Sequence, residues 1–564
     1  MNSASAVSVT ASLDDPFYYL TNFRFVLGWV SERHADLLHP DELAFLNRFD
    51  ALPRISQALL TRMVMRKGEL FRLGKLNYRE IGDTADALAP LVELGWVDTD
   101  PTLSVDELFH QLRLAELRSA LAMPMRDAGL PASAGKAVLQ ATLTPRLTEI
   151  KPLAEWWPTA SDNIVRLKVM DICDRLRLMF FGNLRQDWAE FVLTELGLQR
   201  FENVPFTTTS RAFQQREEVD AYLALHRLRQ RLDEGEPLEQ LSLELPPRPD
   251  NAWLATRRAR LLLQLGREAE RSGQAEQAVL LYAQAKSSEA RIRQLRVLER
   301  LGRHQEAFDL AMNAQRHTPN ETEAQALARL LPRLRKKLKI DAQPPVCEPT
   351  YTRWELTLPG PQPVERAVAQ HVSSPGAPVY YAENTLITGL FGLLCWPAIF
   401  APLPGAFFHP FHSGPADLHR EDFVVRRCGL FDECLARLED GSYRQAIHTA
   451  WQEKHGLASP FVHWPLLDET LLTLALECLP AAHLKVCFER FLQDIKANRA
   501  GLPDLIQFLP DAPLGEPRYR LIEVKGPGDR LQDNQRRWLA FFYQHHIPVA
   551  VCYVQWLADP PGMP

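Results

Sequence analysis

Two neighbouring stretches, GLPDLIQF (501–508) and LIEVKGPGDRLQDNQRRW (521–538), decide the fold of the last part of the chain. Both contain the apolar and β-branched residues that are typical of strands, and the turn-rich residues 510–519 between them predict a hairpin. A helical pattern over 530–546 and an apolar run over 547–554 follow. The expected order is therefore strand, strand, helix, strand.

The expected hairpin gathers three charged side chains. Residues two apart in a strand face the same side, so Glu523 and Lys525 point together, and the hairpin brings Asp504 beside Glu523. Carboxylate oxygens suit Mg²⁺ or Mn²⁺, and a metal in such a site polarises a phosphate and lowers the pKa of bound water. Lys525 would orient that water or offset negative charge. The structural alternative is a surface salt bridge between two strands.

These residues match the PD-(D/E)xK nuclease signature. The GLPD segment, the EVKGP continuation and Gln535 on the following helix resemble the VRR-NUC branch, and EVKGPGDRLQDNQRRWL is similar to the Fanconi-associated nuclease family. The resemblance implies catalytic roles for Asp504, Glu523, Lys525 and Gln535. It also implies metal ligands at Glu383, Asp504 and Glu523, with the Val524 carbonyl as a further ligand.

Glu383 is assigned by the resemblance to the start of a helix over 380–400. A glutamate in the first turn of a helix also commonly offsets the helix dipole or caps the helix, so the sequence leaves both interpretations open.

The resemblance also implies a function. The family cuts near 5′ flaps in branched DNA, degrades from a 5′ end and acts in interstrand-crosslink repair, with a basic pocket for a 5′ phosphate. Arg211 and Arg216 are weak candidates for contacts to that phosphate, and a surface role is an equal alternative. Two other functions remain: a four-way-junction resolvase, and a non-catalytic DNA-binding scaffold. The short N-terminal part suggests a compact bacterial member.

The rest of the chain predicts a multidomain, mainly α-helical protein. We expect a helical N-terminal domain compatible with a winged helix, a SAP-like DNA-binding module with Lys136 near a phosphate, and a TPR-like helical solenoid. A proline-rich linker and a C-terminal α/β PD-(D/E)xK (VRR-NUC) nuclease domain complete the order. These segments are expected at 1–100, 101–149, 150–341, 342–363 and 364–564. The repeat that predicts the solenoid places Gly273 and Gly302 ahead of similar helices.

The charge and the cysteine content of the chain indicate which partner and which compartment to expect. The 564 residues carry a net charge of −6, but residues 251–340 contain 18 Lys and Arg against 9 Asp and Glu, which predicts a phosphate-tracking surface. None of the eight cysteines forms a C-x-x-C motif, and no signal peptide or membrane span is expected. We therefore expect a cytoplasmic, nucleoid-associated protein (nuclear if eukaryotic) with branched DNA as partner and a dimer on DNA as one option.

Other candidates are weaker. His409 and His412 have a metal-like spacing but lack a nearby acidic or cysteine partner in the sequence, and GPGDR lacks the G-K-[ST] ending of a P-loop. Trp156 and Trp157 could stack on bases, although an aromatic anchor in a helical core is the more common role.

Overall fold

The computed structural model describes residues 14–66, 68–188, 199–207, 209–317, 320–340, 351–360, 362–420 and 422–557. The described residues fall into two compact units. Unit 1 comprises residues up to 200 together with 206–219 and 408–411, and unit 2 comprises 201–205, 220–407 and the residues from 412 onward. Each unit is described by itself.

Unit 1 begins with the amphipathic helices that the sequence predicts. Outside the SAP-like segment, the described part of unit 1 contains α1 (Tyr18–Arg33), α2 (Pro40–Ala51), α3 (Arg54–Val64), α4 (Thr84–Glu93), α10 (Met170–Phe181) and the start of α12 (Arg216–Asp233). Asp83 caps α4 because its carboxylate accepts hydrogen bonds from the backbone N–H groups of Ala85 and Asp86. A three-stranded sheet of β1 (Leu70–Arg72), β5 (Ile164–Leu167) and β2 (Val97–Asp98) accompanies these helices, with β5 in the middle.

The SAP-like segment lies in sequence between β2 and β5. It contains the helices α5 (Val105–Gln111), α6 (Leu114–Ala120), α7 (Ala122–Asp127), α8 (Lys136–Leu143) and α9 (Leu153–Trp156) around one apolar core. The short strands β3 (Thr102–Leu103) and β4 (Lys151–Pro152) pair and bring its two ends together. The buried Trp156 donates its indole N–H to the Leu103 carbonyl at 2.8 Å, which is the structural role expected for this tryptophan.

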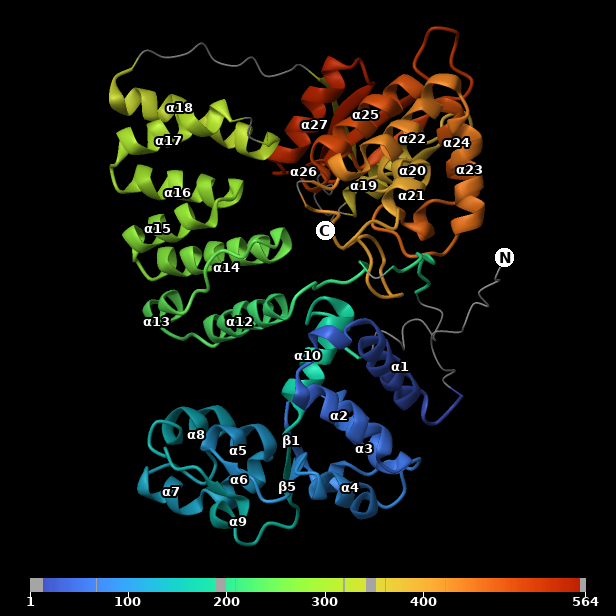
Figure 1. The fold of residues 1–564 in the computed structure, drawn as a ribbon. Coiled ribbons are helices and arrows are strands. Elements are labelled where there is room, and N and C mark those ends of the chain that lie inside the picture. The colour runs from blue at the N-terminus through green and yellow to red at the C-terminus, as the bar shows by residue number, and fades with distance from the viewer. Residues whose placement is uncertain are drawn as a thin grey trace, which may run out of the picture. The chain divides into compact units, whose positions relative to one another are not determined.

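Unit 2 contains a helical solenoid, in which α13 to α18 are stacked in sequence order (Figure 1). After α12 (Arg216–Asp233), these helices are α13 (Leu238–Leu243), α14 (Ala252–Arg271), α15 (Ala275–Ala285), α16 (Ser288–Arg300), α17 (His304–Arg316) and α18 (Glu321–Leu338). The repeated glycines, Gly273 and Gly302, have φ values of 79° and 75° and end α14 and α16 in turns that favour glycine. Each helix packs mainly on its sequence neighbours, as the repeat predicts.

The nuclease part of unit 2 is built on a five-stranded sheet in the order β6-β10-β9-β8-β7. Its strands are β6 (Thr352–Leu358), β7 (Val379–Tyr381), β8 (Leu505–Phe508), β9 (Tyr519–Lys525) and β10 (Val549–Trp556). The predicted hairpin is confirmed, because β8 and β9 are antiparallel. β10 runs parallel to both β9 and β6.

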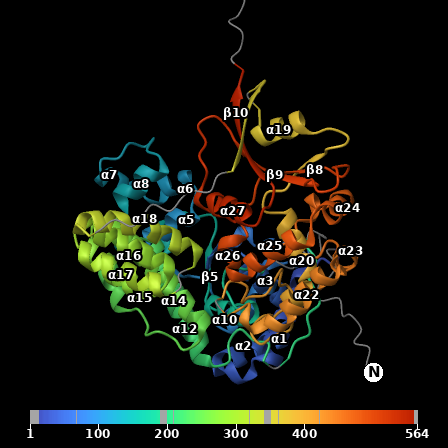
Figure 2. The same cartoon turned by 90° about the horizontal axis from the view of Figure 1, so that it is seen from above.

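Helices cover both faces of this sheet (Figure 2). α19 (Val364–Val372) packs on the face that contains Ile522, Val524 and Cys552. α27 (Asp533–Gln544) packs through Leu539 on Val551, which lies on the opposite face. The remaining helices are α20 (Leu386–Leu394), α21 (Trp396–Ile399), α22 (Cys428–Asp440), α23 (Tyr443–Lys454), α24 (Glu469–Cys478), α25 (Ala481–Gln493) and α26 (Ile495–Asn498).

One expectation about this part was wrong. The stretch 342–363, predicted as a linker from its prolines, contains β6, which forms the outer strand of the nuclease sheet beside β10. Proline is tolerated next to an edge strand because one side of such a strand needs no ladder hydrogen bonds. Residues 341–350 lie outside the described part. The helical solenoid starts later than the predicted limit of 150, because β4, α9, β5 and α10 belong to unit 1. The remaining domain limits stay predictions.

Among the residues that the structure describes, no single helix has the length and apolar character to cross a membrane. The helices α24 and α25, which are separated by a sharp bend, pass that test only when they are taken together, and only by their length and composition.

Candidate active site

Asp504 stands at the entry to β8, as the sequence predicts. Its carboxylate Oδ2 accepts a hydrogen bond from the backbone N–H of Val524 at 2.7 Å, which ties it to the neighbouring strand. Its backbone carbonyl accepts hydrogen bonds from the N–H groups of Ala382 (2.8 Å) and Glu383 (3.2 Å). The hairpin and the segment after β7 are therefore joined at this one residue.

Glu523 and Lys525 share one face of β9, which confirms the alternation expected from the sequence. Lys525 Nζ lies 2.7 Å from Glu523 Oε1, and both side chains are buried. In the register with β10, Glu523 is paired with Val551, whose side chain packs under α27. The acid and the lysine therefore belong to the face of the sheet that α27 covers, next to Asp504.

The two buried acids disfavour negative charge on each other. Burial and then the nearby Glu383 raise the pKa of Asp504 to about 6, although the Val524 N–H and Lys525 act in the opposite direction. Burial and then Asp504 raise the pKa of Glu523 to about 8, while Lys525 lowers it. One lysine does not neutralise this group of acids, and a further cation would relieve the repulsion.

Glu383 lies near these acids, but not where the sequence suggested. The helix expected over 380–400 is wrong at its start, because Tyr380 and Tyr381 belong to β7 and α20 begins only at Leu386. Glu383 occupies the turn between them, followed by Asn384 with φ of 50°. A left-handed residue cannot continue into a helix, so Glu383 neither caps α20 nor lies in its first turn.

Two neighbours of Glu383 were missed by the sequence reasoning. The Tyr381 hydroxyl donates a hydrogen bond to Glu383 Oε2, and Asn384 Nδ2 donates one to Oε1 at 3.1 Å. Asn384 Oδ1 also accepts a hydrogen bond from the N–H of Leu502, two residues before Asp504. The sequence contained one weak signal for the contact between Tyr381 and Glu383, since residues two apart in an extended segment face the same side.

The donor set fits a hard divalent cation, because Asp504 and Glu523 lie side by side and Glu383 lies close enough for its charge to raise the pKa of both. They do not form a ready-made ligand shell within the described residues. Glu383 is turned toward Tyr381 and Asn384, so its carboxylate would have to rotate to join Asp504 and Glu523 around one ion. The ligand roles of these acids and of the Val524 carbonyl stay predictions.

Gln535 has a structural partner. Its Oε1 accepts a hydrogen bond from the backbone N–H of Gln532 at 2.8 Å, which makes it the third residue of a capping box at the start of α27. A direct role in the reaction, implied by the resemblance, would require this bond to open, and it stays a prediction.

The three predicted DNA contacts also have partners within unit 1. Lys136 donates to the Leu112 carbonyl at 3.2 Å from the first turn of α8. Arg211 forms an ion pair with Asp36 at 2.6 Å, and Arg216 forms one with the fully buried Glu42 at 2.7 Å. The two arginines therefore have structural roles, and phosphate binding by any of the three residues stays a prediction.

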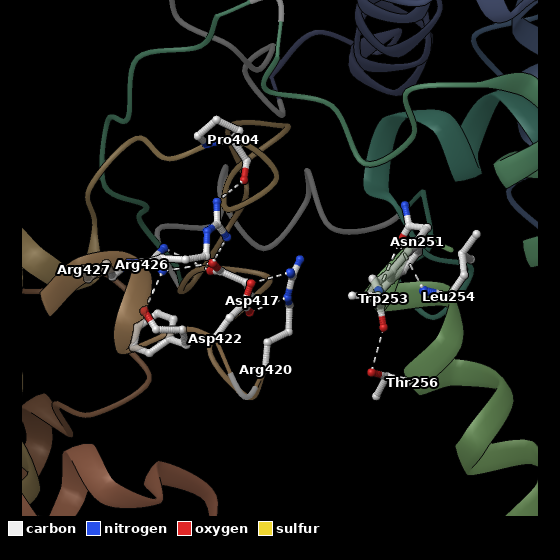
Figure 3. Close-up of polar contacts among 12 residues, drawn as sticks. Asn251, Trp253, Leu254, Thr256, Pro404, Asp417, Arg420, Asp422, Arg426 and Arg427 are labelled. Carbon is white, nitrogen blue, oxygen red and sulfur yellow. Dashed lines mark hydrogen bonds and ion pairs between the residues drawn. The ribbon is translucent and has the colours of Figure 1, made fainter. Parts of the chain in front are cut away.

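Basic residues in unit 2 are likewise partly neutralised. The buried carboxylate of Asp417 holds Arg426 and Arg427 at 2.5 and 2.9 Å, while Arg420 pairs with Asp422 (Figure 3). The same view shows Asn251 at the start of α14, where its side chain accepts hydrogen bonds from two backbone N–H groups. Arg420, Arg426 and Arg427 are thus paired with nearby acids rather than free cations.

His409 also has a structural environment. It is buried against the rings of Phe180 and Phe181, and its Nδ1 accepts a hydrogen bond from the N–H of Phe411 at 3.0 Å. This packing explains the histidine without a metal.

Comparisons with known proteins find related domains and relatives over most of the chain. The chain matches three family models, described as FAN1, HTH domain (residues 17–98), Fanconi anemia-associated nuclease SAP domain (102–156) and VRR-NUC domain (438–556). It is 53% identical to the Fanconi-associated nuclease 1 homolog of Pseudomonas aeruginosa, over 97% of both chains. It is 25% identical to the Oryza sativa homolog over 95% of this chain and 62% of the plant protein.

A solved structure has the same fold. The crystal structure of paFAN1 bound to 2nt 5′ flap DNA with a gap superposes with a TM-score of 0.92, at 53% identity, covering 98% of this chain and all of that one. A second structure, with 1nt 5′ flap DNA, gives a TM-score of 0.91. A VRR-NUC domain implies a phosphodiesterase that uses a divalent metal. The chain belongs to the Fanconi-associated nuclease family and is a DNA nuclease of that family.

Proposed function

We propose that this nuclease cuts branched DNA near 5′ flaps with Mg²⁺ or Mn²⁺, degrades DNA from a 5′ end, and acts in interstrand-crosslink repair. The observation that carries the proposal is the intact set of Asp504, Glu523 and Lys525 on one sheet face. It occurs in a chain that matches, over nearly its full length, a protein crystallised on 5′ flap DNA.

The residues divide the chemistry among them. Asp504, Glu523 and a rotated Glu383 would hold the metal, with the Val524 carbonyl as a further oxygen ligand. The bound metal would polarise the scissile phosphate and lower the pKa of a water molecule. Lys525, fixed at 2.7 Å from Glu523, would orient that water or offset charge on the phosphate. The products would carry a 5′ phosphate and a 3′ hydroxyl.

The rest of the chain would hold the duplex arms through their phosphates rather than through bases. The basic last turn of α18, with Arg335, Lys336 and Lys337, supports this role for the solenoid. Lys136, Arg211 and Arg216 would contribute in unit 1. We place the protein in the cytoplasm on nucleoid DNA, with dimer formation on long flaps as part of the proposal.

The test is cutting of a 5′-labelled flap duplex by wild type and by Asp504→Asn and Lys525→Met. Both substitutions preserve side-chain size while they remove a charge. Lys485→Met is the matched control, because Lys485 pairs with Glu439 on the surface. Metal-dependent incision near the junction should disappear in the two site variants and persist in the control, with DNA binding retained in all three.

Two other results of the cutting assay would support one of the alternative functions. Tight flap binding without incision by wild type, under any divalent metal, would contradict the proposal and favour a DNA-binding scaffold. Paired symmetric incisions on a four-way junction, faster than cutting of the flap, would favour a resolvase.

A further inference from the structure

One stripe of α18 faces the nuclease part of unit 2. Glu321, Gln325 and Arg329 are four residues apart and therefore lie along one side of the helix. The opposite side, with Leu327 and Leu331, is buried in the core of the solenoid. The polar stripe is thus free to contact α27, whose partner residues Asp533 and Arg537 are also four residues apart.

The contacts follow this spacing. Arg329 forms a bidentate ion pair with Asp533, with Nη1–Oδ2 and Nη2–Oδ1 distances of 2.5 and 2.6 Å. Gln325 donates to the Asp533 carbonyl at 3.2 Å and accepts from Arg537 at 2.6 Å. A bidentate arginine–carboxylate pair fixes direction as well as distance, so these contacts set how α18 and α27 face each other.

A second anchor lies one turn away. Glu321 accepts from Arg490 of α25 at 2.6 Å, and Arg537 lies 3.7 Å from the same oxygen. The Arg490 guanidinium is nearly buried and lies 4.6 Å from the ring centre of Trp538 of α27. The last helix of the solenoid therefore holds α27 at two points.

Polar contacts, rather than close packing, determine this junction. A cavity of about 240 Å³ lies beside the Arg329–Asp533 pair, between Ile292 and Leu330 of the solenoid and Arg537 of α27. Both partners of the pair are about half exposed, so it contributes only about 0–1 kcal/mol to stability. Its effect is on geometry, because the cavity beside the pair leaves room for one element to shift past the other.

The first turn of α27 also contacts the segment that carries Asp504. Gly501 has φ of 92°, and a Cβ atom there would lie 2.8 Å from the Asn534 side chain, so the two backbones approach closely. Gly501 is three residues before Asp504. Adjacent residues of α27 thus face two directions: Asp533 contacts the solenoid, and Asn534 contacts the catalytic segment.

We propose that Arg329 and Asp533 are positioning residues that couple the solenoid to the catalytic face and thereby set the distance between the flap junction and the cut. The inference rests on the proposed flap cutting. If the solenoid holds a duplex arm, the angle between α18 and α27 determines which phosphate reaches Asp504 and Glu523. The pair acts through α27 and touches neither the metal nor the phosphate.

The experiment maps incision sites at single-nucleotide resolution on a 5′-labelled flap for wild type, Arg329→Ala, Asp533→Asn and the reversed pair Arg329→Asp/Asp533→Arg. Arg333→Ala is the matched control: it lies one turn further along α18, is 53% exposed against 51% for Arg329, and pairs with Glu299 inside the solenoid. Mn²⁺ binding by titration calorimetry reports on the metal site without any turnover.

We expect Arg329→Ala and Asp533→Asn to spread the incision over neighbouring phosphates and to slow cutting by roughly tenfold or more, because small misplacements of reacting groups are costly. Mn²⁺ affinity should stay at the wild-type value, and the reversed pair should restore one main site. Arg333→Ala should cut as wild type does.

The inference is overturned if Arg329→Ala gives the same cut pattern as Arg333→Ala, or if Mn²⁺ affinity falls along with the rate. The second result would indicate damage to the site itself. Because Arg329→Ala leaves α27 unchanged, it decides the question even if Asp533→Asn weakens the start of that helix. Absence of flap cutting by wild type would instead refute the proposed function.

Discussion

Replacing Arg216 by alanine is expected to lower the stability of unit 1 by about 2–3 kcal/mol. Glu42 is completely buried, and Arg216 is one of two arginines that hold its carboxylate, at 2.7 Å, with Arg175 at 2.5 Å. Burial alone would raise the pKa of Glu42, but hydrogen bonds from Arg216, the His39 N–H and Arg175 outweigh it and bring the pKa below its ordinary value.

The magnitude follows from what remains after the substitution. Removing one partner of a buried pair costs about 3–5 kcal/mol when the other charge is left without compensation. Glu42 keeps Arg175 and the His39 N–H as partners. The loss of stability should therefore lie at or below the lower end of that range. For a unit of this size, we expect the thermal midpoint to fall by roughly 5–10 °C.

The assay is thermal unfolding, with Arg211→Ala as the control. Arg211 pairs with Asp36, whose side chain is mostly exposed, and this pair should contribute only about 0–1 kcal/mol. Adding Glu42→Gln to Arg216→Ala should recover part of the loss, because glutamine carries no buried charge and still serves in a capping box.

The pH dependence gives a second check. A carboxylate with a depressed folded pKa stabilises the protein above its unfolded pKa of about 4.3, and this stability is lost as pH falls through the folded value. The difference between wild type and Arg216→Ala should therefore shrink in acid. The structural role is wrong if Arg216→Ala has the same thermal midpoint as the wild type but binds DNA more weakly and with a smaller salt dependence. That result would indicate a phosphate contact.

Three further outcomes are expected. Tyr381→Phe removes the hydroxyl that holds Glu383 away from Asp504 and Glu523, and it should lower the Mn²⁺ concentration for half-maximal cutting by up to about tenfold in a metal titration. Gly392→Ala places a methyl group 2.7 Å from Phe461 Cβ and should destabilise unit 2 by about 1–3 kcal/mol in denaturant unfolding. Burial, and then two neighbouring arginines, lower the pKa of His34 to about 4. Unit 1 should therefore lose stability as pH falls from about 6.5 toward 4, and His34→Leu should flatten that profile of thermal midpoints.

Local patterns were sufficient for the hairpin and the solenoid. The alternation in LIEVK determines that Glu523 and Lys525 share a face, and this needs no long-range information. The glycines before α15 and α17 mark helix ends by the same local logic. These features were predictable because the residues that form them are close in sequence.

Features that depend on distant partners were not predictable in this way. The strand β6 is stabilised by pairing with β10, almost 200 residues later, and its flanking prolines resemble a linker. The turn at Glu383 depends on Asp504 and Leu502, which come more than 100 residues later in the chain and form hydrogen bonds with residues 382–384. Arg216 has the composition of a phosphate contact, and only the fold reveals that Glu42 is its partner.

The position of β10 affects how the protein is made on the ribosome. β10 is the last described strand in sequence order, yet it lies inside the sheet, between β6 and β9. A nascent chain that has not yet emerged beyond residue 549 leaves β9 with an open edge and α27 without the Val551 surface on which it packs. The nuclease face can therefore assemble only after β10 has emerged, so a nascent chain that stops before β10 should not cut DNA.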